Sequence, residues 1–355
     1  MGQKGRQYCY SCTVAEGRVA KEGDLRMTED QGHGAVGREV TRFIRVPTSV
    51  SQQARQFLSM DMFGDSADRL DPNDIDGWRA RITATDEMLI AVLGPEINQL
   101  GATVESRSID GVPIFVVVPD GVDDGTDQPI YLDIHGGALV MGGGKACEVM
   151  SQKMAAQVQM RTWSVDYRMP PDHPYPAALD DVMAVYKSLL DIQAPERLVV
   201  GGGSAGGNLA AALILRARDE GLPLPAALVL LTPEGDLTES GDSFQTNLGI
   251  DCILTASLAD SIALYANGHD LHDPYLSPIF GDLSSPFPPT FLQTGTRDLF
   301  LSNAVRMHRK LRSGGVDAEL HVFEAMPHGG FFGAPEDDEL TAELRRFLTR
   351  HLDDR

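Results

Sequence analysis

From Arg161 to the end of the sequence, two patterns of apolar residues alternate along the chain. Short runs such as "RTWSVDYR", "RLVVGGG", "AALVLLTP", "PTFLQTGT" and "AELHVFEA" are typical of buried strands. Between them lie longer stretches with apolar residues three and four positions apart, such as "YPAALDDVMAVYKSLL", which indicate helices. Strands that alternate with helices pair in parallel, and the helices cover the faces of the sheet. We therefore predict an α/β fold with a mostly parallel central sheet flanked by helices.

Three segments depart from this alternation. The segments "ATVESRSID", "VPIFVVVPDG" and "QPIYLDIHGG" predict three successive strands, so we expect antiparallel strands at the start of the sheet. Upstream of them, residues 46–100 have helical apolar spacing. Between "LLTP" and "PPTFLQ" lie more than fifty residues with only short helical patches. Because a long excursion in a compact domain usually has a function, we predict that this one forms a lid over the active site.

The charge of the chain limits its partners. A formal net charge of −21 repels phosphate backbones and anionic lipid surfaces, which disfavours nucleic acid and membranes as partners. No apolar run approaches the ~18–20 residues that cross a bilayer, and the first residues lack the apolar core of a signal peptide. We expect a cytoplasmic protein whose partner is a small molecule, and a homodimer is left open.

Residues 1–26 differ from the rest of the chain. They carry five Lys or Arg against three Asp or Glu, and they lack apolar periodicity. Cys9 and Cys12 form a C-x-x-C, but no thiolates or imidazoles at matching spacing lie nearby to complete a zinc site. We expect a disordered leader with two free thiols, and Met27 is an alternative start of the natural chain.

The stretch "RLVVGGGSAGGNLAA" has two interpretations. Gly201, Gly203 and Gly206 have the G-x-G-x-x-G spacing of a dinucleotide-binding turn. Shifted by one position, Gly202 to Gly206 read G-x-S-x-G, the turn that exposes a nucleophilic serine, here Ser204. The dinucleotide turn belongs to the first strand–helix unit of its domain, whereas several units precede this one. The partners of Ser204 therefore decide between the two.

Ser204, Asp298 and His328 follow predicted strands in the chain order that is expected for an α/β-hydrolase. His328 could take the proton of the serine hydroxyl and return it to a leaving alcohol. Asp298 would hold the imidazole in the right tautomer and stabilise the imidazolium. These three residues are the predicted catalytic triad. The weaker candidates are Asp282 and Glu324 for the acid, and His321, which lies inside a predicted strand, for the base.

A glycine pair ends an earlier strand, in "YLDIHGGALV". Glycine has no Cβ, so the backbone N–H groups of Gly136 and Gly137 can approach a bound oxygen closely. The N–H of Ala205, directly after the serine, is the third predicted donor of this oxyanion hole, and it begins a helix whose dipole favours negative charge.

"GGSAGG" and "HGGA" together resemble the GDSAG and HGGG motifs of the hormone-sensitive-lipase-like (bacterial family IV) esterases. "VDYRMPPDHPYPAALDD" is similar to the YRLAPEHPFPAA segment of that family, and "DPYLSPIFGDL" matches its DPxxSP block. The resemblance covers residues 112–355. It implies a catalytic core over residues 101–235 and 283–355, with residues 27–100 and 236–282 as a helical cap.

The resemblance also implies that His135 orders the oxyanion loop, although a purely structural role fits equally well. Three departures from the family pattern are visible. Gly203 replaces the Asp before the serine, and "PEG" from Pro233 replaces Ser-Pro-Trp. Ala138 replaces the third glycine of HGGG, which keeps the N–H but adds a methyl group near the acyl oxygen. None of the three removes a predicted catalytic group.

The function predicted from these features is a serine carboxylesterase that hydrolyses short- to medium-chain acyl esters through an acyl-serine, without cofactor or metal. An amidase or lactonase would use the same triad, so both stay open as alternatives. A non-catalytic small-molecule receptor on the same fold is the alternative from another class, and the retained His328 weighs against it. An acidic chain without an amphipathic anchor suits soluble esters better than lipid surfaces.

Overall fold

The computed structural model divides the chain into two units, residues 1–45 and residues 46–355. The predicted disordered leader, residues 1–26, lies outside the described residues, and so do Cys9 and Cys12. The structure describes residues 28–29, 36–37, 40–60, 69–97, 99–123 and 125–353.

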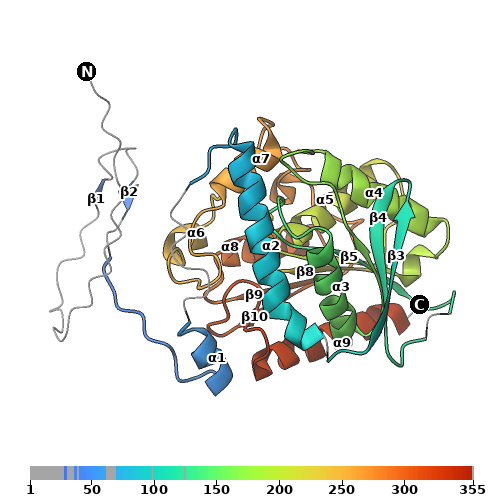
Figure 1. The fold of residues 1–355 in the computed structure, drawn as a ribbon, viewed down its shortest axis with the longest axis horizontal. Helices are drawn as coiled ribbons and strands as arrows, with labels where there is room; N and C mark the ends of the chain where they lie inside the picture. Colours follow the sequence, from blue (N-terminus) through green and yellow to red (C-terminus); the bar gives the residue numbers. More distant parts are fainter. Residues whose placement is uncertain are drawn as a thin grey trace. The chain divides into compact units, whose positions relative to one another are not determined.

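An eight-stranded sheet forms the centre of the second unit (Figure 1). Its strands lie in the order β10-β9-β8-β7-β5-β6-β4-β3. β3 pairs antiparallel with β4, and β4 with β6, whereas all other neighbours in this sheet are parallel. The predicted α/β fold, with antiparallel strands at its start, is therefore confirmed. The strands are β3 (Ala102–Ile109), β4 (Val112–Pro119), β5 (Ile130–Ile134), β6 (Arg161–Val165), β7 (Leu198–Gly203), β8 (Ala227–Leu231), β9 (Thr290–Gly295) and β10 (Ala318–Phe323), and a separate pair in the first unit is β1 (Thr28–Glu29) with β2 (Val36–Gly37).

Helices flank this sheet, as the alternating pattern predicts. Helix α3 follows β5, α4 follows β6, α5 follows β7 and α8 follows β9, so each of these helices connects two neighbouring or nearby strands. The helices are α1 (Gln52–Phe57), α2 (Ile75–Ile97), α3 (Lys145–Val158), α4 (Ala177–Leu190), α5 (Ala205–Asp219), α6 (Ser243–Thr246), α7 (Ala259–Ala266), α8 (Leu301–Ser313) and α9 (Pro335–Asp353), with short 3₁₀ turns η1 (Pro195–Arg197) and η2 (Pro278–Phe280).

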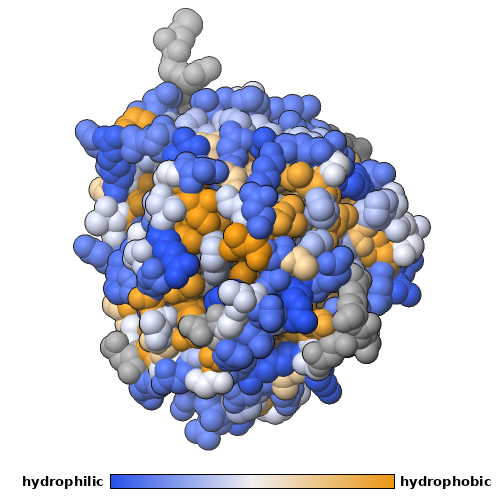
Figure 2. Space-filling model, turned by 90° about the vertical axis from the view of Figure 1, so that its right-hand side faces the viewer, coloured by the Kyte–Doolittle hydropathy of each residue, from blue (hydrophilic) through white to orange (hydrophobic). Residues whose placement is uncertain are grey.

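The apolar residues of the central strands pack into two layers, one on each face of the sheet. In β5, Leu132 points into the larger cluster, which includes buried residues of α4, α5 and α8, whereas Tyr131 points into the smaller cluster with α9. In β7, Val200 likewise belongs to the larger cluster and Val199 to the smaller one. Strands that are buried on both faces need continuous apolar runs, which is the pattern that identified them in the sequence. Figure 2 shows the outside of one face, where hydrophilic side chains dominate and hydrophobic ones emerge in patches between them.

The segments predicted to form a cap contain helices that pack on helices flanking the central sheet. Helix α2 runs alongside α3 (Figure 1), where Leu93 and Ile97 pack against Val149. Helix α1 follows Ser51, whose backbone N–H and hydroxyl both donate to the Glu336 carboxylate, at 2.7 and 2.8 Å. The division into cap and core stays a prediction. In the part of the chain that the structure describes, no helix combines the length and the apolar character needed to cross a bilayer.

Candidate active site

Ser204 lies in a sharp turn between β7 and α5. Its backbone has φ 56° and ψ −121°, a conformation that costs free energy for any residue with a side chain. Three hydrogen bonds hold the turn, because the Ser204 N–H donates to Leu231 O at 2.8 Å and Ser204 O accepts from Glu234 N and Asn208 N. The turn presents the serine hydroxyl at the carboxyl end of β7, where open α/β sheets form their sites.

The glycines around Ser204 are required by close packing. A Cβ on Gly206 would lie 1.8 Å from the carbonyl oxygen of Ile134, and a Cβ on Gly202 would lie 2.4 Å from the carbonyl carbon of Gly206. The turn therefore sits directly against the end of β5, and only glycine permits this approach. Gly203 is different, because its nearest neighbour would be Leu231 O at 3.8 Å. A side chain has space there, so steric exclusion does not explain why Gly203 replaces the Asp of the related motif.

The three predicted triad residues lie together. His328 Nε2 is 2.9 Å from Ser204 Oγ, and His328 Nδ1 is 3.1 Å from Asp298 Oδ1. Asp298 is fully buried, and it also accepts from the Phe300 N–H at Oδ1 and from the Thr294 hydroxyl at Oδ2. A carboxylate only accepts hydrogen bonds, so the Nδ1 of His328 must carry the proton. Nε2 is then the basic nitrogen, and it faces the serine hydroxyl.

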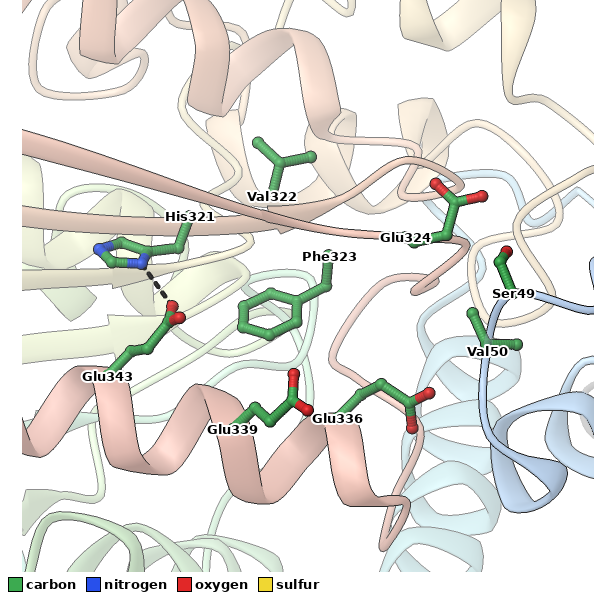
Figure 3. Close-up of a pocket in the computed structure, with 9 residues that line it drawn as sticks. All are labelled: Ser49, Val50, His321, Val322, Phe323, Glu324, Glu336, Glu339 and Glu343. Carbon is green, nitrogen blue, oxygen red and sulfur yellow. Dashed lines mark hydrogen bonds and ion pairs between the residues drawn. The ribbon is translucent and has the colours of Figure 1, made fainter.

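The weaker candidates lie elsewhere. His321 lies on β10, where its Nδ1 contacts Glu343 on α9 at 2.5 Å (Figure 3). It lines a hollow between β10 and α9 whose lining contains none of the three triad residues. Glu324 belongs to the same lining, and Asp282 accepts the N–H of Ser284 in an exposed turn. Neither carboxylate contacts a histidine of the residues that the structure describes.

The oxyanion loop passes close to Ser204. A Cβ on Gly136 would lie 3.3 Å from the Cβ of Ser204, so the backbone of this loop lies in contact with that serine. Gly137 has φ +127°, and a Cβ there would lie 2.0 Å from Met141 O. Within the described residues, the backbone N–H groups of Gly136, Gly137 and Ala205 donate to no protein acceptor, so they are available to a bound oxygen. Ala138 has a positive φ, 51°, which glycine would adopt at less cost.

His135 contacts this loop and the Tyr167 ring. Its carbonyl oxygen accepts the Tyr167 hydroxyl at 2.9 Å, and its ring stacks on the Tyr167 ring with centroids 4.1 Å apart. Its Nδ1 lies 2.7 Å from Gly136 O, so Nδ1 carries a proton and donates it to that carbonyl. Burial lowers the pKa of His135 to about 4, which keeps the ring neutral. A neutral, clamped ring suits a supporting role and not proton transfer.

Asp251 is a buried carboxylate at the site that sequence reasoning missed. Its Oδ1 accepts the N–H of Ile253 at 2.9 Å, and its Oδ2 accepts the N–H of Leu299, the residue after Asp298, at 2.8 Å. The N–H of His328 lies 3.3 Å from the same Oδ2. Asp251 therefore connects the 236–282 segment to the backbone next to Asp298 and to the backbone of His328. Burial raises the pKa of Asp251 to about 6, and the nearby Asp298 adds to this rise whereas His328 opposes it.

A second buried acid, Glu234, lies directly behind Ser204. Its backbone N–H donates to Ser204 O at 3.0 Å, and its own carbonyl accepts from the side chain of Asn208 at 2.8 Å. Neither oxygen of the Glu234 carboxyl has a hydrogen-bond partner in the described part of the chain. Burial raises the pKa of this carboxyl to about 8, with a smaller contribution from Glu239. Glu234 is therefore protonated at neutral pH and does not act as an anion.

Comparison with known proteins agrees with the fold. A family model for the alpha/beta hydrolase fold matches residues 131–332. An esterase of Acinetobacter venetianus is 32% identical over 227 residues, which are 62% of this chain and 74% of that protein. The carboxylesterase NlhH of Mycobacterium tuberculosis is 32% identical over 246 residues, or 66% of this chain and 76% of that one.

Solved structures extend the similarity over more of the chain. The crystal structure of an esterase called E25 is 39% identical, with a TM-score of 0.81, and the match covers 88% of this chain and 98% of that one. An esterase from the bacterial hormone-sensitive lipase family is 30% identical with a TM-score of 0.74, and the match covers 85% and 99%.

Proposed function

The chain belongs to the hormone-sensitive-lipase-like esterases of the α/β-hydrolase family, and we propose that it is a serine carboxylesterase with Ser204 as its nucleophile. The observation that carries this proposal is the continuous relay of contacts from Ser204 Oγ through the two ring nitrogens of His328 to the buried Asp298. A serine hydroxyl is a weak nucleophile at neutral pH and needs such a base within hydrogen-bond reach.

In the first half of the reaction, His328 Nε2 takes the proton of Ser204 as Oγ attacks the carbonyl carbon of the ester. The carbonyl oxygen becomes an oxyanion that accepts hydrogen bonds from the N–H groups of Gly136, Gly137 and Ala205. Loss of one such donor typically costs about 2.7–4 kcal/mol of transition-state stabilisation. When the C–O bond to the alcohol breaks, the proton on Nε2 moves to the leaving alkoxide oxygen, and the acyl group stays on Ser204.

In the second half, water replaces the alcohol. His328 Nε2 takes a proton from that water, and the resulting nucleophile attacks the acyl carbon in the same oxyanion hole. The bond to Ser204 Oγ then breaks, and the proton on Nε2 returns to Oγ. Asp298 keeps the ring in one tautomer throughout and stabilises the imidazolium that forms twice in each cycle. Every step uses groups of this chain and of the substrate.

We place the substrates among short- to medium-chain acyl esters. The net charge of −21 keeps the protein away from anionic lipid surfaces, which supports esters in solution over lipid aggregates. Amides and lactones pass through the same tetrahedral intermediate, so the triad alone does not separate them from esters.

A panel of p-nitrophenyl acetate, butyrate, octanoate and palmitate, together with the matching anilides, tests this proposal. We expect the highest kcat/KM on the acetate, butyrate or octanoate, and only weak turnover of the anilides. Ser204→Ala should abolish turnover, whereas Ser59→Ala, a change of an exposed serine that bonds Arg55 O, should not alter it. After treatment with phenylmethylsulfonyl fluoride, mass spectrometry should find the phenylmethylsulfonyl group on Ser204. Full activity of Ser204→Ala, or binding of esters without turnover by the unmodified protein, would contradict the proposal, and the second result would support a receptor.

A further inference from the structure

Three side chains with metal-ligand atoms meet beneath the oxyanion loop. A ring nitrogen of His135, the Sγ of Cys147 and a carboxylate oxygen of Asp166 all lie within 4.8 Å of one another. His135 and Cys147 are buried, and Asp166 is partly exposed. Neither Cys147 nor Asp166 takes part in the proposed ester hydrolysis, and the role given to His135 there uses only its Nδ1 and its carbonyl group.

The sheet register brings two of these residues together. β5 and β6 pair in parallel with Ile134 opposite Val165, so the next residues, His135 and Asp166, leave the sheet side by side. Cys147 comes from the first turn of α3 and lies next to the same strand end, with its Sγ 3.8 Å from Val165 O. The three ligand atoms are therefore held by a strand pair and a helix, which are rigid elements.

The histidine is already in the state that binds a metal. Its Nδ1–H donates to Gly136 O at 2.7 Å, so the lone pair of the neutral ring is on Nε2. Nε2 is buried and has no hydrogen-bond partner among residues 40–60, 69–97, 99–123 and 125–353. Metal-binding histidines usually donate their other ring N–H to a carbonyl or carboxylate, which fixes the ring in this way. The stacked Tyr167 ring restricts the imidazole further.

The surroundings supply negative charge for a cation. The Asp166 carboxylate accepts the Gly144 N–H at 2.9 Å and forms no ion pair with a Lys or Arg of the described residues. A second carboxylate, Asp86, binds the same loop through the Gly142 N–H at 2.8 Å. A buried unpaired polar group costs free energy, and a ligated cation would remove that cost for Nε2.

From this geometry we propose that His135, Cys147 and Asp166 bind one Zn²⁺ ion, with water as the fourth ligand. A nitrogen, a sulfur and a single carboxylate suit zinc, whereas Mg²⁺ and Ca²⁺ take oxygen ligands. Neighbouring ligand atoms of tetrahedral zinc lie roughly 3.5 Å apart, so separations of up to 4.8 Å must shorten by about 1.3 Å at most. Binding converts the Cys147 thiol to a thiolate and releases one proton to solvent.

Occupation of this site would act on the oxyanion loop. His135 precedes Gly136 directly and is hydrogen-bonded to its carbonyl oxygen, while Gly136 lies against Ser204. A ring drawn toward Cys147 and Asp166 pulls on this carbonyl and displaces the oxyanion donors. Zinc is therefore an inhibitor that lowers kcat and leaves KM nearly unchanged, because it does not occupy the substrate site. It supplies no step of the proposed hydrolysis.

The test uses the full chain with Cys9 and Cys12 both replaced by Ser, since that pair is itself a set of thiolate donors. After treatment with a chelator, Co²⁺ is added as a spectroscopic probe and Zn²⁺ in competition with it. We expect one ion per chain, a thiolate-to-cobalt charge-transfer band, and displacement of the band by Zn²⁺. Binding should weaken at least tenfold in Cys147→Ser and also in Asp166→Asn, which keeps an acceptor for Gly144. Cys252→Ser, which changes the other described cysteine, should bind as before.

The proposal is overturned if the band is absent, if it is lost in Cys252→Ser, or if Cys147→Ser and Asp166→Asn both keep full affinity. Asp166→Asn decides the question alone if Cys147→Ser fails to fold. Because cobalt binding is read without any ester, a failure here leaves the proposed esterase activity untouched, and a failure of that activity leaves this site untouched.

Discussion

The substitution Asp298→Asn tests the acid of the triad, and the structure sets how large its effect should be. Asp298 Oδ1 receives two donors, the N–H of Phe300 at 2.9 Å and Nδ1 of His328 at 3.1 Å, while Oδ2 receives the hydroxyl of Thr294 at 2.6 Å. An asparagine amide must place its oxygen on one side and its NH₂ on the other. If the NH₂ group faced Phe300 and His328, it would meet two other donors and no acceptor. If the NH₂ group faced Thr294, the hydroxyl of Thr294 could rotate and accept its hydrogen bond. The second arrangement is favoured, and it keeps the tautomer of His328.

Asp298→Asn should therefore remove the negative charge without reversing the tautomer. The imidazolium that forms in the transition state then loses a partner whose charge centre lies roughly 4–5 Å away, worth about 3–4 kcal/mol at an effective dielectric constant of about 20. That corresponds to a fall of roughly two to three orders of magnitude in kcat. In a serine protease in which asparagine imposes the wrong tautomer on the histidine, the loss is about 10⁴-fold. The smaller loss expected here follows from the position of Thr294.

The assay is steady-state hydrolysis of p-nitrophenyl butyrate at neutral pH. We expect KM to change little, because the carboxylate contacts the histidine and not the ester. Asp282→Asn, in its exposed turn, is the matched control and should keep kcat within about twofold. A loss of less than about tenfold in Asp298→Asn would refute the charge argument. A loss near 10⁴-fold would show that the amide takes the other orientation and that the Thr294 reasoning is wrong.

Three further predictions follow from individual residues. Ala138→Gly should stabilise the protein by about 0.5–1 kcal/mol, as measured from the midpoint of urea unfolding. Glycine adopts the positive φ of residue 138 without strain, and this gain exceeds the extra entropy that glycine gives the unfolded chain. Glu234→Gln should flatten the dependence of stability on pH. The raised pKa of Glu234, about 8 against an ordinary 4.5, gives the folded protein stability that is full below pH 4.5 and is lost as the pH rises through 8. The variant should therefore melt higher than the wild type at pH 9 and not at pH 4, and parallel curves would contradict this. Asp251→Asn should lower both stability and kcat. Both oxygens of Asp251 accept backbone N–H groups, so the NH₂ of the asparagine must face a donor, and the lost hydrogen bond costs about 1–3 kcal/mol. An unchanged kcat would mean that Asp251 does not position His328.

Much of this fold and site could be predicted from sequence, because the relevant signals are local. Strands buried on both faces leave apolar runs, and the turn at Ser204 leaves glycines at the two positions where a Cβ would overlap the backbone. Asp298 and His328 follow from strand order alone, since parallel strands bring their carboxyl ends to one edge. Their contacts with each other and with Ser204 are present in the structure.

The residues that sequence reasoning missed act over long separations. Asp251 is a single acid in the apolar stretch "GIDCIL". The N–H groups of Leu299 and His328, which donate to its carboxylate, lie 48 and 77 residues further along the chain. Nothing local distinguishes it from a surface aspartate. The approach of His135 and Asp166 depends on the register of β5 and β6, which no turn signal specifies because a helix connects the two strands. The positive φ of Ala138 was also unforeseen, since alanine rarely adopts it.

The two halves of the triad are secured by different parts of the chain. Ser204 and the oxyanion loop are tied to the central strands, whereas the backbones next to Asp298 and at His328 are tied through Asp251 to residues inserted after β8. Gentle warming that loosens residues 236–282 would separate His328 from Ser204 while the sheet stays intact. Such a molecule would lose its catalytic power several degrees before it melts, and would regain it on cooling without having to refold.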